Sequence, residues 1–244
     1  MNTLSPSNFD EIGTVRLVEL GHRLTEDSTS RVWHYARAGG SSIARGVMTV
    51  SADQDAQRVN LSFASAPAIG DKEVSVTIGT GAATADDYQD GWLVVQDGTG
   101  EGRAYPIEGH DAITASTAGT FKLKEAIDTA GALSEVNVDL IKNRYDDIVI
   151  GPGSDNLDVP TGVPTVALTT LYFGWVQTWG PCSVWQDETS GVGADLSTGD
   201  ETAGTVDTSA ASDPTIGIQG PQGGVGRQSA GSRAHKPFFR LGSR

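Results

Sequence analysis

Alternation of apolar and polar residues with a period of two recurs along this chain and constrains its fold more than any other feature. Val59, Leu61 and Phe63 alternate with polar neighbours, and segments 74–78 and 136–140 repeat the pattern. Successive side chains of a strand point to opposite faces of its sheet, so the pattern predicts half-buried strands. No helix longer than about two turns is predicted. Further strands are expected at 14–20, 31–37, 46–50, 92–96, 103–108, 120–124, 165–177, 182–186, 204–207 and 236–241.

Turn-forming residues separate these strand candidates. Glycine and proline account for 31 and 10 of the 244 residues. Short links such as Asp97-Gly98 and Gly180-Pro181 favour antiparallel hairpins. We therefore expect a mainly β protein, an antiparallel barrel or sandwich of β-tulip or jelly-roll-like type, with extended terminal arms and only short helices.

One short helix is expected at residues 84–91. Thr84 and Asp87 have the spacing of a capping box, and Tyr88 would face inward. Gly91 would end the helix with a positive φ.

Proline and glycine also indicate where domains meet. The run from Gly151 to Pro164 is the strongest junction, because proline fixes φ and cannot donate to a sheet. A weaker junction lies near residues 64–70. The predicted organisation is an N-terminal arm (1–13), a first β domain (14–64 and 161–226), an inserted β module (65–150), a linker (151–160) and a basic C-terminal arm or strand (227–244).

Charge is distributed unevenly along the chain. The net charge is −14, yet no acidic residue follows Asp213, and five of the 17 cationic residues lie after it. Residues 1–213 therefore carry −19 and the tail +5. An acidic body argues against direct contact with nucleic acid. The tail could clamp to an acidic neighbouring subunit or simply solvate the chain end.

Targeting and membrane signals are not expected. No run approaches the roughly 20 apolar residues of a membrane helix, and the first ten residues lack a signal-peptide pattern. We therefore expect a soluble chain with no membrane partner.

Motifs for catalysis or metal binding are also not expected. The single cysteine, Cys182, lies between Trp179 and Trp185 in the sequence, and we predict that it is a small core residue. The acidic pairs do not have the spacing of a calcium-binding loop, so we interpret them as solvated carboxylates in preference to calcium ligands. We expect no cofactor, no metal and no enzymatic activity. The four histidines are too widely spaced for a zinc site: His22, His34, His110 and His235.

Aromatic residues gather in one segment, and they are the main candidates for an interface. On a regular strand, Phe173, Trp175 and Trp179 would share one face and Tyr172 would lie on the other. Two aromatic faces indicate a core plus either an interface or a sugar-stacking platform. The interface is preferred, because the segment offers few carboxylate or amide partners for a sugar. The candidate interface residues are Tyr172, Phe173, Trp175, Trp179, Trp185, Arg233, Lys236, Phe238, Phe239 and Arg240.

Two segments, Asp90 to His110 and Leu171 to Cys182, resemble the virion structural proteins of tailed bacteriophages, and the similarity extends from about residue 60 to residue 220. This resemblance implies a β-rich particle protein without enzymatic activity. By analogy it further implies a capsid decoration (cement) protein. Such a protein would be made in the host cytoplasm, bind the outside of the major capsid protein lattice as a homotrimer, and stabilise the shell.

Two other functions remain open at this point. A glycan- or receptor-binding β module of a phage tail or cell surface is motivated by the tryptophans, and it requires an exposed Trp175 or Trp179. A β-barrel hydrolase with a dispersed active site is the third hypothesis.

Overall fold

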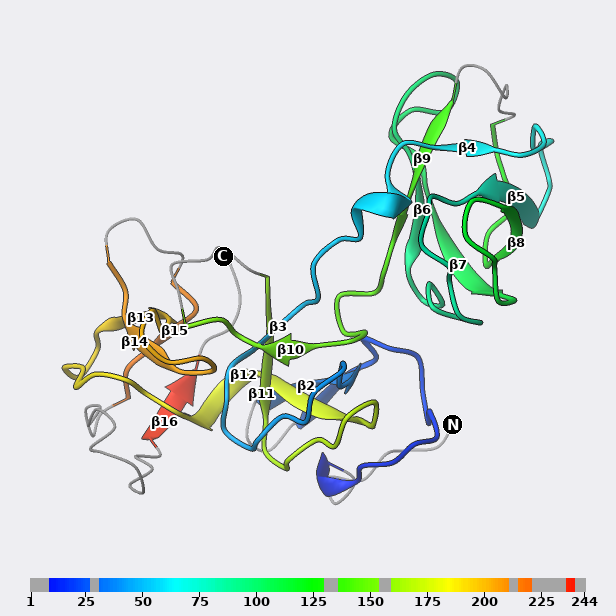
Figure 1. Cartoon of the computed structure of the whole chain (residues 1–244). Coiled ribbons are helices and arrows are strands. Elements are labelled where there is room, and N and C mark those ends of the chain that lie inside the picture. Colours follow the sequence, from blue (N-terminus) through cyan, green and yellow to red (C-terminus); the bar gives the residue numbers. More distant parts are fainter. Residues whose placement is uncertain are drawn as a thin grey trace. The chain divides into compact units, whose positions relative to one another are not determined.

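The protein is built almost entirely from antiparallel β-structure (Figure 1). The computed structural model describes residues 9–26, 31–129, 136–153, 159–210 and 215–220, together with the backbone of residues 236–239. These residues contain 16 strands and no α-helix, only short 3-10 turns such as η2 (Ala56–Arg58). The prediction of a mainly β, antiparallel protein is confirmed.

The chain divides into two compact units. The sheet unit consists of Met1–Ala52 and Arg144–Arg244, and the barrel unit of Asp53–Asn143. These boundaries differ from the predicted junctions because strand pairing, which is non-local, decides them. β4 (Leu61–Phe63) pairs with strands of the barrel, whereas β10 (Val149–Ile150) pairs with β3 (Thr49–Val50) of the sheet unit. Gly151, the first residue of the predicted linker, also belongs to the sheet unit, because its amide donates to Met48 O.

The sheet unit contains one large and one small sheet. β12 is its longest strand, and it pairs with β2 and β11 along its first half and with β16 along its second. The large sheet has the order β1 (Arg23–Glu26), β2 (Arg31–Arg37), β12 (Phe173–Val184), β11 (Pro160–Pro164), β3, β10, with β16 (Lys236–Phe239) added beside β12. The small sheet has the order β14 (Val206–Thr208), β13 (Asp195–Thr198), β15 (Gly217–Ile218).

The barrel unit is a closed antiparallel barrel. Its strands follow the expected alternation, so inward residues such as Val74 and Val76 of β5 are buried between exposed or half-buried neighbours. Among the described residues, its core contains 18 buried apolar residues that lie between Leu61 and Leu140. The closed order is β4, β5 (Glu73–Thr77), β8 (Ala118–Leu123), β7 (Ala104–His110), β6 (Trp92–Val95), β9 (Asn137–Ile141).

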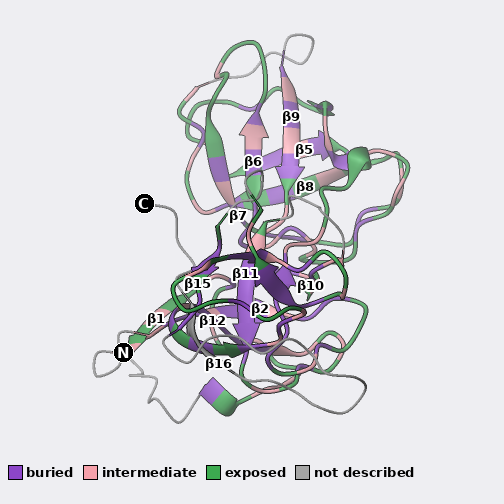
Figure 2. Cartoon of the chain, turned by 90° about the vertical axis from the view of Figure 1, so that its left-hand side faces the viewer, coloured by how far each residue is buried: buried purple, intermediate pink, exposed green. Residues whose placement is uncertain are grey.

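Both faces of the large sheet are covered. On β12, Trp175 packs into an aromatic cluster on one face, while its neighbour Val176 packs into an aliphatic cluster on the other. Figure 2 shows the resulting buried residues along β2, β11 and β12. β12, which carries Phe173, Trp175 and Trp179, is therefore a central element of this unit.

The expected helix at residues 84–91 is not formed. Residues 85–90 form successive turns, and Asp86 and Asp90 adopt positive φ there. Gly91 does not end a helix. A Cβ on Gly91 would overlap the carbonyl oxygen of Ile141, so this position requires glycine because two backbones approach closely. Tyr88 does face inward, as predicted, and is 1% exposed.

The described parts of the two predicted arms pack on the sheet unit. The Phe9 ring is buried and stacks on Trp33 with a centroid separation of 4.4 Å, and Gly13 pairs with Phe173. Residues 9–13 are therefore held by aromatic stacking and a β-bridge; residues 1–8 lie outside the described part. At the other end, residues 236–239 form β16 against β12 of the same chain.

Candidate functional site

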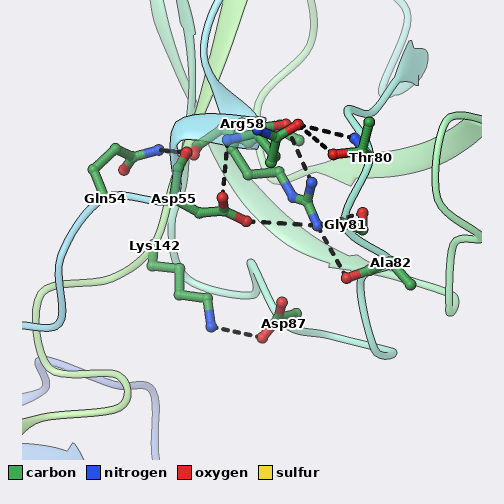
Figure 3. Close-up of polar contacts among 10 residues, drawn as sticks. Gln54, Asp55, Arg58, Thr80, Gly81, Ala82, Asp87 and Lys142 are labelled. Carbon is green, nitrogen blue, oxygen red and sulfur yellow. Dashed lines mark hydrogen bonds and ion pairs between the residues drawn. The ribbon is translucent and has the colours of Figure 1, made fainter.

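A polar network joins the two chain segments that enter and leave the barrel unit to the loop between β5 and β6, residues 78–91 (Figure 3). The incoming segment contributes η2, which is capped when Asp55 Oδ1 accepts from the Gln57 amide at 2.8 Å. The side chain of Gln57 accepts two hydrogen bonds from the loop. Its Oε1 receives the Thr80 amide at 3.1 Å and the Thr80 hydroxyl at 2.7 Å.

Arg58 is the central residue of this network. Its side chain is 2% exposed, and Nη2 donates to Gly81 O at 2.8 Å and to Ala82 O at 3.0 Å. The nearest carboxylate is Asp55, at 3.8 Å from Nη2 and itself 45% exposed. The buried guanidinium is thus compensated mainly by backbone carbonyls of the loop.

The outgoing segment holds the same loop from its other end. Lys142 Nζ donates to Asp87 Oδ1 at 2.7 Å. The Lys142 ammonium and the Arg58 guanidinium each lie 5.8 Å from the centroid of the Tyr88 ring, within cation–π range. Burial raises the pKa of the Tyr88 phenol, which keeps the ring neutral between these two cations.

The network is a clamp rather than a reactive centre. Gln57 and Arg58 of the incoming segment and Lys142 of the outgoing segment bind the same loop, and Gln54 Nε2 donates to Leu140 O of β9. The incoming segment is held to the loop by several hydrogen bonds of Gln57 and Arg58, and the outgoing segment by the Lys142–Asp87 ion pair. We call residues 54–58, 79–82, 87–88 and 142 the barrel clamp.

The predicted aromatic interface is only partly available at the surface. Trp175 is 2% exposed and belongs to the core, so its assignment to an interface is wrong for this chain. Phe173 is half-buried and stacks on Tyr35 at 5.9 Å. We predicted that Phe173, Trp175 and Trp179 would share one face of a regular strand. The pairing of β12 with β2 is irregular between Gln177 and Trp179, so the alternation of faces is interrupted before Trp179 and this prediction does not hold. Tyr172, Trp179 and Trp185 are half-buried.

The structure places part of the predicted basic interface on a strand. Lys236, Phe238 and Phe239 lie on β16, whose backbone pairs with β12 of the same chain. Arg233 and Arg240 lie outside the described residues.

The sequence analysis missed an exposed aromatic residue on the barrel. Trp92 of β6 is 44% exposed, and its direct cross-strand neighbours are Pro106 of β7 and Ile141 of β9. Ile141 is itself 36% exposed. We call Pro106, Trp92 and Ile141 the Trp92 row. The sequence of β6 is apolar at four consecutive positions, so the pattern alone did not show that Leu93 faces the core and Trp92 faces outward.

Cys182 behaves as the small core residue that the sequence predicted. It is 4% exposed and packs among apolar residues, and burial raises the pKa of its thiol to about 12. Among the described residues, no group of three or more His, Cys, Asp or Glu side chains is placed to hold a metal ion. In the same part of the chain, no helix is long and apolar enough to cross a membrane.

Comparison with protein-family models, with curated proteins and with solved structures found no match to this chain. Of the two segments singled out in the sequence, Asp90 to His110 contains the β6–β7 hairpin of the barrel, and Leu171 to Cys182 contains most of β12 of the sheet unit.

Proposed function

We propose that this chain is a structural protein of a tailed-phage particle, a capsid decoration protein that attaches as a homotrimer to the outside of the major capsid protein lattice and stabilises the shell. The observation that carries the proposal is the barrel clamp. A cement protein must keep its shape while force acts between coat subunits, and the clamp couples both connections of the barrel to one loop through buried and charge-assisted hydrogen bonds.

Two further features support this proposal. The segments that resemble virion proteins form paired strands, β6 and β7 of the closed barrel and β12 inside the large sheet, so the resemblance involves the framework and not a peripheral loop. The chain also provides broad β surfaces, which suit attachment to a lattice through buried area.

The glycan-binding alternative loses its original motivation. It required an exposed Trp175 or Trp179, but Trp175 is buried in the aromatic cluster and Trp179 is half-buried. The one described tryptophan that offers a large exposed surface is Trp92, on the barrel.

Sedimentation velocity tests the proposal directly. The purified chain should sediment with three times its mass of 25.4 kDa. It should also cosediment with shells that lack it and raise their melting temperature. A monomer that neither binds the shells nor changes their melting would contradict the proposal.

A further inference from the structure

The Trp92 row is an apolar strip on the outer surface of a closed barrel. Directly paired residues of neighbouring antiparallel strands lie about 5 Å apart. Pro106, Trp92 and Ile141 therefore form a continuous line across β7, β6 and β9. Val94, two residues along β6, is half-buried and continues the apolar surface next to exposed Ala104. A tryptophan in such a setting is the residue type that contributes most binding energy in protein interfaces.

The surroundings of this strip are polar and held in place. Asp90, two residues before Trp92, accepts from Lys124 Nζ at 2.9 Å. Lys142, next to Ile141, pairs with Asp87. On the far side, the Asp139 carboxylate accepts from Gln96 Nε2 at 2.8 Å. An apolar centre with a polar rim is the usual composition of a protein docking surface.

Electrostatics indicate which partner this surface would accept. The barrel unit contains six Lys and Arg residues against 15 Asp and Glu residues, a net charge of −9. Three of its cations, Lys124, Lys142 and Arg103, form ion pairs with carboxylates, and Arg58 is buried. The other two, Lys72 and Lys122, are exposed. Exposed Glu108 and half-buried Asp139 lie on strands of the row, so a cationic partner is favoured there.

Two other occupants fit less well. A symmetric contact between the Trp92 rows of two copies would bring together two barrel units that each carry a net charge of −9, which opposes such a contact. A glycan would need free polar groups beside the indole ring, whereas the direct cross-strand neighbours of Trp92 are Pro106 and Ile141.

We infer that the Trp92 row is a docking surface for a cationic protein segment that inserts an apolar side chain against Trp92. The identity of that segment rests on the proposed function, under which it belongs to the coat subunit. The chemistry of the surface does not depend on that assignment.

Calorimetry with a defined probe tests the surface on the full chain. The probe is a synthetic peptide of alternating leucine and lysine, compared with oligolysine and with a neutral oligosaccharide. The wild type should bind the Leu-Lys peptide, and binding should weaken as NaCl rises from about 50 to about 300 mM. Trp92→Thr, which keeps a residue favoured in strands, should weaken binding at least about tenfold.

Ile69→Thr is the matched control, because Ile69 is an apolar residue of the same unit that is 70% exposed and lies outside the row. It should bind the peptide within about twofold of the wild type. Ile141→Thr provides a second test if Trp92→Thr does not keep the wild-type melting temperature. Equal binding by Trp92→Thr and wild type, equal binding of oligolysine, or Trp92-dependent binding of the oligosaccharide would each overturn the inference.

Shell binding separates this inference from the proposed function. If the wild type cosediments with shells and Trp92→Thr does so equally well, the docking surface is wrong while the decoration function stands. If the wild type ignores shells but binds the Leu-Lys peptide through Trp92, the decoration function is wrong while the docking surface stands.

Discussion

His34 is a half-buried side chain that we expect to make this fold sensitive to acid. Its ring stacks on Tyr145 at 4.8 Å, and Nδ1 lies 2.9 Å from the Thr178 hydroxyl. Burial lowers the pKa of His34 from 6.5 to about 4, with smaller contributions from Arg144, Arg23 and His22. The folded state therefore favours the neutral imidazole of His34.

The sign of the resulting pH dependence follows from proton binding. Between pH 6.5 and about pH 4 the unfolded chain binds a proton at His34 that the folded chain does not bind. The free energy of unfolding therefore falls as the pH falls through this window.

Substitution of His34 by glutamine should reduce that loss. We expect the melting temperature of His34→Gln to fall less than that of the wild type between about pH 7 and about pH 5. Thermal melts at both pH values check this, with exposed Thr25→Gln as the control that keeps the wild-type dependence. If the melting temperature of His34→Gln falls as much as that of the wild type, the acid sensitivity comes from groups other than His34.

At the scale of elements, the barrel clamp depends on one buried cation. Replacement of Arg58 by methionine would remove the guanidinium nitrogen that donates to the carbonyl oxygens of Gly81 and Ala82. We expect Arg58→Met to lower the free energy of unfolding by about 3 kcal/mol. Urea unfolding measures this change.

Lys142→Met is the matched comparison, because it removes a clamp cation whose side chain is 27% exposed. A partly exposed ion pair contributes about 1 kcal/mol or less, so this variant should stay close to the wild type. Similar losses in the two variants would mean that Arg58 has no special position in the clamp.

At the scale of the whole molecule, the barrel unit has everything that an independent domain needs. Its strands close on themselves, and in the part of the chain that the structure describes its core cluster lies entirely within Leu61–Leu140. The clamp also lies within Asp53–Asn143. We expect the isolated fragment 53–143 to fold, with a β-type circular dichroism spectrum and a cooperative thermal transition. A fragment that melts without cooperativity would show that its stability depends on the sheet unit.

The local structure of this protein follows from its sequence. Alternation at 74–78 and 136–140 predicted strands that the structure contains, because the direction of a side chain on a strand depends only on its own backbone. The burial of Cys182 was also predicted correctly, and so was the inward position of Tyr88, although the helix on which the Tyr88 prediction rested is not formed.

Tertiary structure decided the features that bear on function. The observed boundaries of the two units differ from the predicted ones because β4 pairs with β9 and β3 pairs with β10. No local sequence pattern encodes pairing between strands so distant in sequence. Trp175 and Trp92 both lie on largely apolar strands. One is buried and the other exposed because the large sheet is covered on both faces, whereas a barrel strand has one face in the core and the other outside.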